Sequence, residues 1–129
     1  MHHVQQLING EFSQSNTSEW INITDPATQD IIAKVPQSTD DEINEAVATA
    51  KAAFATWRKT PITTRARIFL KYQALIREHM DELAQILTAE QGKTLADARG
   101  DVFRGLEVVE HAAGIANLQM GDFVENVAS

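Results

Sequence analysis

The pattern of apolar and polar positions divides the chain near Pro36. Before this proline, short apolar runs are separated by turn residues, which is typical of β-strands. After Ser38, apolar residues recur every three or four positions, which is typical of helices that bury one face. The sequence therefore predicts a mainly α fold with an N-terminal β-hairpin and short strands.

The strands are predicted mainly from the turns that bound them. Asn9-Gly10 lies within the stretch 5–12, and it predicts a type I′ hairpin because both residues tolerate a positive φ. Further strands are expected over 19–24 and 31–35, joined by a turn over 25–28. His2 and His3 precede the hairpin, and we expect them on a loose terminus.

Four helices are predicted, over residues 40–58, 62–77, 80–91 and 94–118. Thr39 and Glu42 match a capping box at the first helix, and Thr60-Pro61 is expected to cap and begin the second. One apolar face is expected on the first helix, formed by Ile43, Val47, Ala50, Phe54 and Trp57. Close approach of another backbone to the fourth helix is expected from its interior glycines, Gly100, Gly105 and Gly114.

A sharp corner is predicted between the third and fourth helices. Gly92 can adopt the left-handed conformation that ends a helix, and Lys93 complements the helix dipole there. Thr94 can accept a hydrogen bond from the amide of Asp97 and so cap the next helix. Gly92-Lys93-Thr94 is not a phosphate-binding loop, because Leu87 occupies the position of the first glycine in that motif.

Composition and charge narrow the class of protein. Of the 129 residues, 43% are hydrophobic and 22% are charged, as in ordinary globular domains. The net charge of −7 argues against a nucleic-acid partner, although one basic segment runs from Arg58 to Arg77. We interpret that segment as a solvated helix face. No apolar run approaches the length of a membrane span, so we expect no membrane partner and a cytoplasmic location.

Few residues are candidates for chemistry. The chain contains no cysteine, which excludes a thiol nucleophile and disulfides. Glu107 and His111 share a helix face, but a metal site needs three or four ligands and no second pair completes the set. Gly100 and Gly105 lack the strand-turn-helix setting of a dinucleotide-binding motif. We therefore assign no catalytic and no cofactor-binding residue.

Several stretches resemble the N-terminal part of the aldehyde dehydrogenase superfamily. Glu90-Gln91-Gly92-Lys93 carries the resemblance, and the run GDVFRGLEVVEHA at 100–112 is most similar to the CoA-acylating methylmalonate-semialdehyde dehydrogenases. The stretch 25–29 resembles the family's Asn-Pro-Ala-Thr-Gly turn, with Asp25 in place of Asn and Gln29 in place of Gly. The family's chains are several times longer, so we expect residues 1–129 to be the first portion of such an enzyme, ending before its active site.

The resemblance implies an activity that this chain cannot perform alone. The intact enzyme would use NAD and CoA to oxidise methylmalonate or malonate semialdehyde to an acyl-CoA, through a thioester on cysteine. We expect the chain to bind neither cofactor and to act as a scaffold against the rest of a homo-oligomeric dehydrogenase. Residues 1–36 would supply hairpin and strands, residues 37–121 four helices, and residues 122–129 the start of another strand.

One site carries over from the resemblance. Family members bind a monovalent cation through backbone carbonyls before the turn and an acidic residue near the Gly-Lys pair. The matching residues are Ile23 and Thr24, through their carbonyls, and Glu90, through its carboxylate. The competing interpretation is that Glu90 only pairs locally.

A different class of function also explains the lack of catalytic residues. The chain would then be a free-standing helical module that binds a protein partner through its apolar faces. The two hypotheses differ on the surface, because a portion of a larger enzyme should expose a large apolar area and a complete module should not.

Overall fold

The computed structural model describes residues 2–122 and 125. Two small sheets open the described part of the chain. β2 (Gln6–Ile8) and β3 (Glu11–Ser13) form an antiparallel hairpin, and the sheet beside it has the order β1-β5-β4. β4 (Trp20–Thr24) pairs antiparallel with β5 (Ile31–Pro36), whereas β1 (His2–His3) pairs parallel with β5. The predicted hairpin is confirmed, with φ of 57° at Asn9 and 80° at Gly10.

The expectation that His2 and His3 lie on a loose terminus is wrong. Both residues pair with β5, and the His3 ring lies 4.4 Å from the Trp20 ring, measured between centroids. The Trp20 indole also donates a hydrogen bond to the Thr17 carbonyl at 3.2 Å. A parallel pairing between residues 31 positions apart leaves no local sequence signal, so the pattern of the first residues did not reveal it.

Five helices follow the strands in the part of the chain that the structure describes. They are α1 (Asp40–Trp57), α2 (Ile62–Glu78), α3 (Met80–Gln91), α4 (Leu95–Ala113) and α5 (Ile115–Leu118). The fourth predicted helix is therefore wrong in its length, because the chain breaks at Gly114 and resumes as the short α5. Thr60 does not cap α2, which starts at Ile62 with Pro61 at the N-cap position and no side-chain cap. The strand expected from Phe123, Val124 and Val127 falls outside the described residues.

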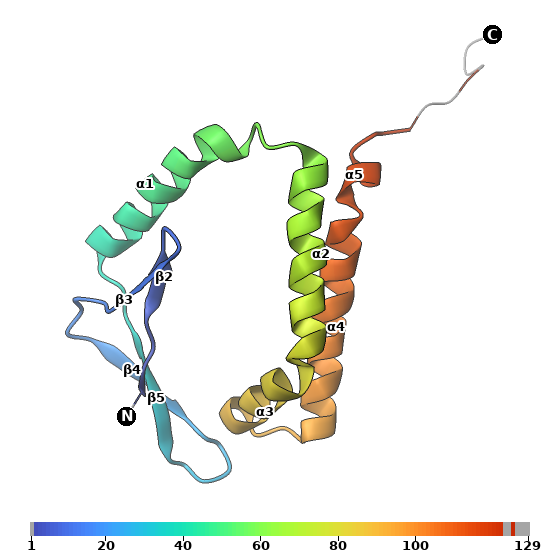
Figure 1. The fold of residues 1–129 in the computed structure, drawn as a ribbon. Coiled ribbons are helices and arrows are strands. Elements are labelled where there is room, and N and C mark those ends of the chain that lie inside the picture. The colour runs from blue at the N-terminus through green and yellow to red at the C-terminus, as the bar shows by residue number, and fades with distance from the viewer. Residues whose placement is uncertain (1, 123–124, 126–129) are drawn as a thin grey trace.

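The helices pack very unevenly. α2 and α4 run side by side, and α3 crosses near one end of the pair (Figure 1). α1 stands apart from them, joined to α2 through the segment 58–61 and packed extensively against no described element (Figure 1). None of the 18 residues of α1, all described, is buried. The apolar face predicted for α1 is present, but nothing in the described chain covers it.

The core of the described chain is small. Its buried apolar residues are Ile76, Ala84, Ala98 and Leu106, which lie on α2, α3 and α4. The accessible surface is 10011 Å². A compact monomer of 14.3 kDa would expose roughly 6,800 Å², so the chain exposes about 3,200 Å² more than a self-contained domain. Large apolar side chains form much of this surface, including Leu7, Phe12, Ile43, Val47, Phe54, Ile68, Leu70, Tyr72, Ile86, Phe103 and Val108.

Candidate functional site: the helix corner and the strand turn beside it

The corner between α3 and α4 has the geometry that the sequence predicts. Gly92 follows α3 with φ at 77°, and its amide donates to the Thr88 carbonyl at 2.8 Å. Thr94 precedes α4 in extended conformation, and its hydroxyl accepts from the Asp97 amide at 3.2 Å. The Asp97 carboxylate accepts from the Thr94 hydroxyl at 3.0 Å. Glycine and threonine thus satisfy polar groups at the two helix ends that meet there.

The turn between β4 and β5 lies directly against this corner. A Cβ built on Gly92 would lie only 2.5 Å from Cγ of Pro26. The turn itself is held by Asp25, whose carboxylate accepts from the Ala27 amide at 2.8 Å. Residues 66 positions apart are thus brought into contact, and only a residue without a side chain fits between them.

Gln29 adopts a backbone conformation that normally favours glycine. Its φ is 67°, and its side-chain amide donates to the Pro26 carbonyl at 2.8 Å. This is the position at which the family pattern has glycine, and Gln29 adopts the positive φ that glycine readily takes. The hydrogen bond offsets part of the cost of a left-handed conformation in a residue with a Cβ.

Ion pairs stabilise the corner on its α4 side. The Lys93 ammonium and the Arg104 guanidinium both donate to the Asp101 carboxylate, and Arg99 pairs with Asp81 across α4 and α3. The hydrogen bond from Lys93, and then that from Arg104, lower the pKa of Asp101 below its ordinary value. Lys93 was expected to complement the dipole of α3, but its ammonium instead pairs with α4.

The residues proposed to bind a cation lie on both sides of this contact. Ile23 and Thr24 end β4, directly before the turn that meets Gly92, and Glu90 lies in the last turn of α3. The register of β4 against β5 shifts between Ile23 and Thr24, as at a β-bulge. A bulge interrupts the ladder of backbone hydrogen bonds. The Glu90 side chain is exposed. The fold therefore brings the two candidate segments into the same neighbourhood.

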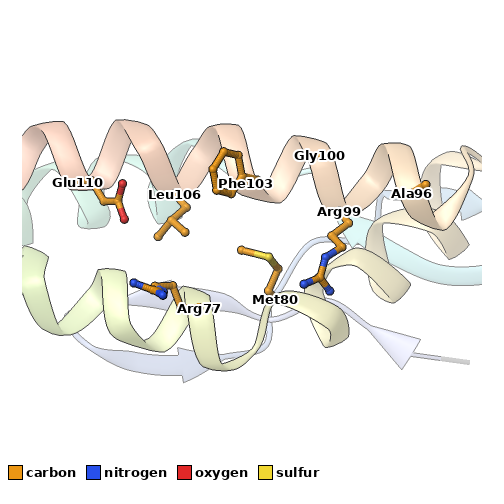
Figure 2. A pocket seen from close by; sticks show the side chains of 8 residues that line it. All are labelled: Arg77, Met80, Ala96, Arg99, Gly100, Phe103, Leu106 and Glu110. Carbon is orange, nitrogen blue, oxygen red and sulfur yellow. The ribbon is translucent and has the colours of Figure 1, made fainter.

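A hollow lies at the junction of α2, α3 and α4. It encloses about 670 Å³, and its lining consists of Arg77, Met80, Ala96, Arg99, Gly100, Phe103, Leu106 and Glu110. Leu106 and Met80 point toward one another across it, while Arg77 and Arg99 lie nearer its two ends (Figure 2). Glu110 accepts from the Gln73 amide at 3.0 Å, and Arg99 is paired with Asp81. The polar groups are thus partly paired within the chain, and no described serine, threonine, lysine or histidine side chain lines the hollow.

The Glu42 carboxylate accepts hydrogen bonds from four residues, and the sequence predicted only its pairing with Thr39. The capping box is confirmed, because Glu42 accepts from the Thr39 amide at 2.9 Å and Thr39 accepts from the Glu42 amide. Glu42 also accepts from the Ser15 hydroxyl at 2.8 Å, the Asn16 amide at 2.7 Å and the Gln6 side chain at 3.2 Å. The capping pattern revealed the local bonds, whereas the partners 26 to 36 residues away gave no signal.

No group of three or more histidine, cysteine, aspartate or glutamate side chains in residues 2–122 and 125 could hold a metal ion. The pair Glu107 and His111 thus gains no third such ligand in that part of the chain. None of the described helices is long and apolar enough to cross a membrane. A Cβ built on Gly100 or Gly105 would meet no backbone atom of the described chain outside α4 within 4 Å, so the expected close approach gains no support there.

The structure described so far is mainly helical with short strands, and the chain has no cysteine. Comparison with known proteins gives its family. The sequence profile of the aldehyde dehydrogenase family matches residues 12–129, so the chain belongs to that family. Within the family, the chain is 56% identical over 126 residues to the mitochondrial acylating methylmalonate-semialdehyde dehydrogenase of Arabidopsis thaliana. It is 47% identical over 124 residues to the human methylmalonate-semialdehyde/malonate-semialdehyde dehydrogenase, also acylating and mitochondrial.

Solved structures agree with this assignment. A putative methylmalonate-semialdehyde dehydrogenase from Sinorhizobium meliloti, complexed with NAD, matches the whole chain with a TM-score of 0.90 and 38% identity. The methylmalonate-semialdehyde dehydrogenase of Oceanimonas doudoroffii matches 99% of the chain with a TM-score of 0.90 and 34% identity. The predicted fold class is confirmed.

The chain is much shorter than the proteins it matches. The comparisons cover 98% of this chain but 21% of the Arabidopsis enzyme, and 96% of this chain but 23% of the human enzyme. Of the two solved structures, 26% of each chain is covered. The matched part is the N-terminal part of these enzymes. The alternative, a free-standing interaction module, finds no support among these relatives.

Proposed function

We propose that this chain forms the N-terminal part of an NAD-dependent, CoA-acylating dehydrogenase of methylmalonate semialdehyde or malonate semialdehyde. The observation that carries the proposal is the 56% identity to an acylating methylmalonate-semialdehyde dehydrogenase over nearly the whole chain. NAD as cofactor is supported by the solved relative from S. meliloti, which is complexed with it. CoA is supported by the word acylating in the names of the curated relatives.

The role of these residues in the enzyme is that of a scaffold. The chain has no cysteine to form a thioester, and its described surface is about 3,200 Å² larger than that of a compact domain of its mass. Such a surface suits packing against the remainder of the dehydrogenase and against neighbouring subunits of a homo-oligomer. In that packing, the strands would come from residues 1–36 and the helices from residues 37–121. The start of a further strand would come from residues 122–129.

Enzymatic assays test the proposal. The 129-residue chain, mixed with NAD, CoA and malonate semialdehyde, should form no NADH. A chimera in which this chain replaces the matching 126 residues of the Arabidopsis relative should form NADH only when the semialdehyde is present. Release of acyl-CoA by the chimera would support the acylating reaction. A well-folded chimera that forms neither product would contradict the proposal, as would turnover by the chain alone.

For the cation, we propose that the Ile23 and Thr24 carbonyls and the Glu90 carboxylate contribute ligands to one monovalent ion. The contact between Pro26 and Gly92 supports this, because it holds the two segments together. The chimera should unfold at a higher temperature in NaCl or KCl than in tetramethylammonium chloride of equal ionic strength. Glu90→Gln should abolish the difference, and the control Glu107→Gln should preserve it. Equal unfolding temperatures in all three salts would contradict the site.

Cellular location stays a prediction. The relatives from Arabidopsis and human are mitochondrial by name. Fractionation of cells from the source of this chain would test the expected cytoplasmic location.

A further inference from the structure

The turn of the hairpin holds a pair of residues that favours an intramolecular reaction of asparagine. Asn9 is followed by Gly10, whereas the other asparagines of the chain precede threonine, isoleucine, glutamate, leucine or valine. The amide nitrogen of the following residue can attack the side-chain carbonyl carbon of asparagine, and a side chain on that residue hinders the approach. Glycine has no side chain, so the Gly10 amide is the least hindered nucleophile of this kind in the chain.

The structure leaves both reacting groups accessible. Asn9 and Gly10 are exposed, and their φ angles of 57° and 80° are those of a type I′ turn. Among the backbone hydrogen bonds of the described turns and loops, none uses the Gly10 amide. A Cβ built on Gly10 would meet no heavy atom within 4 Å, and Asn9 borders a hollow of about 380 Å³. Within the described chain, the Gly10 amide is therefore free to turn toward the Asn9 side chain.

We propose that Asn9 is a site of spontaneous modification, at which asparagine is converted to isoaspartate and aspartate. The Gly10 nitrogen forms a bond to Cγ of Asn9, and the side-chain nitrogen leaves as ammonia. Water then opens the resulting cyclic imide. Opening at Cγ gives aspartate, whereas opening at the main-chain carbonyl gives isoaspartate, in which the chain runs through the side-chain carbons. The net reaction converts an amide and water to a carboxylate and ammonium, without oxidant or reductant.

Isoaspartate at this position changes the register of the hairpin. Ile8 pairs with Glu11 directly across the turn. Isoaspartate adds a methylene to the main chain between them, and the register of a hairpin is fixed by its turn type and loop length. Gln6, on the same strand, donates to the Ser38 hydroxyl at 2.7 Å and to the Glu42 carboxylate at 3.2 Å. A shifted hairpin therefore also loses its attachment to the start of α1.

Both products add negative charge where carboxylates already lie. The net charge of the chain is −7, and the reaction makes it more negative by the charge of one carboxylate. The hollow beside Asn9 is also lined by Glu11, Glu42 and Glu45. Because like charges repel, aspartate alone weakens the contact between the hairpin and α1 while it keeps the main chain unchanged. Isoaspartate combines this repulsion with the longer main chain.

Mass spectrometry of the 129-residue chain tests the site. The chain is kept at physiological temperature and mildly alkaline pH, with and without urea, and is digested with trypsin at intervals. Asn9, Asn16 and Asn22 fall in one tryptic peptide, 1–34, because Lys34 is the first residue after which trypsin cuts. Replacement of NH2 by OH should be at least roughly tenfold faster at Asn9 than at Asn16 or Asn22, which precede β-branched residues. Isoaspartate is identified by its methylation with isoaspartyl methyltransferase and labelled S-adenosylmethionine.

Two variants separate the chemistry from its structural effects. Gly10→Ala strains the turn at φ 80° and so loosens it, but the added methyl group hinders the attacking amide. This variant should therefore be modified severalfold more slowly at Asn9. Asn9→Asp carries the added charge without the added methylene. Amide hydrogen exchange over residues 6–13 should thus be faster in the isoaspartate-containing chain than in Asn9→Asp, and slowest in the unmodified chain.

Each outcome decides the proposal. Equal rates at the three asparagines, or modification of Asn9 only in urea, would overturn it, because the folded turn would then protect the site. Faster modification of Gly10→Ala would also overturn it, since mobility of the turn would then set the rate. Equal hydrogen exchange in the isoaspartate-containing chain and in Asn9→Asp would refute the change of register.

The chimera with the Arabidopsis remainder carries the test to a whole enzyme. Asn9 should be modified there as it is in the 129-residue chain, and protection of Asn9 in the chimera would overturn the site for the enzyme. The rate at Asn9 does not depend on the proposed reaction. A chimera that forms no NADH but is modified at Asn9 would therefore contradict the proposed function alone.

Discussion

At the scale of single residues, Glu42 connects parts of the chain that are far apart in sequence. Its carboxylate accepts hydrogen bonds from Thr39 on its own helix boundary, from Ser15 and Asn16, and from Gln6 on the hairpin. The backbone amides of Asn16 and then Thr39 are the main reason that the pKa of Glu42 falls to about 2. Hydrogen bonds that favour the charged form of a carboxylate lower its pKa.

This shift predicts how stability depends on pH. Because the folded pKa of Glu42 lies below its ordinary value of 4.5, its contribution is fully present above that value and is lost as the pH falls toward about 2. Glu42→Gln should lower the unfolding temperature of this chain by a few degrees at neutral pH and flatten its dependence between pH 4.5 and 2. Circular dichroism at a series of pH values measures both. Glu45→Gln, one turn along α1, is the control; an identical acid profile for the two variants would contradict the assigned role.

At the scale of elements, the corner between α3 and α4 and the turn between β4 and β5 depend on each other. Gly92 has a positive φ and lies against Pro26, so the corner needs glycine for two reasons. Sequence reasoning found the first reason, because a glycine after a helical run indicates a left-handed end. It could not find the contact with Pro26, because Pro26 and Gly92 come together only when the turn between β4 and β5 packs against the helices.

Substitution at Gly92 measures this dependence. Gly92→Ala should lower the free energy of unfolding by about 1–3 kcal/mol, since alanine is strained at positive φ and its Cβ meets the proline ring. Gly105→Ala is the control. It lies inside α4 with no heavy atom within 4 Å of an added Cβ, so it should raise the free energy of unfolding by about 0.5–1 kcal/mol. Urea denaturation followed by circular dichroism gives both values, and equal effects of the two substitutions would refute the contact.

At the scale of the whole molecule, the exposed apolar surface is the main property. The described helices and strands bury only Ile76, Ala84, Ala98 and Leu106 as apolar core residues, while many larger side chains are exposed. This is how a portion of a larger protein differs from a complete domain of equal length. The family match gives the reason, because the enzymes that contain this portion are about four times longer.

The exposed surface makes the isolated chain bind hydrophobic dyes. We expect anilinonaphthalene sulfonate fluorescence to rise several-fold more with the 129-residue chain than with an equal mass of the chimera, because the remainder covers apolar faces. Size-exclusion chromatography of the same samples should show self-association of the chain at high concentration. Weak dye binding by a monomeric chain would indicate a self-contained domain and contradict the scaffold role.

The sequence by itself determined most of the elements, several of their ends and the family. Hairpin, capping box and helix corner follow from local chemistry, since a positive φ, a capping hydroxyl or an apolar stripe needs only neighbouring residues. Only the tertiary structure decided that β1 pairs with β5, that α4 stops at Gly114, that Glu42 binds the hairpin and that Pro26 meets Gly92. The pairing of β1, the bonds of Glu42 to the hairpin and the contact of Pro26 with Gly92 depend on distant residues, whose partners no local pattern specifies. The uncovered state of α1 belongs with them, because a stripe of apolar residues predicts a buried face but not the polypeptide that buries it.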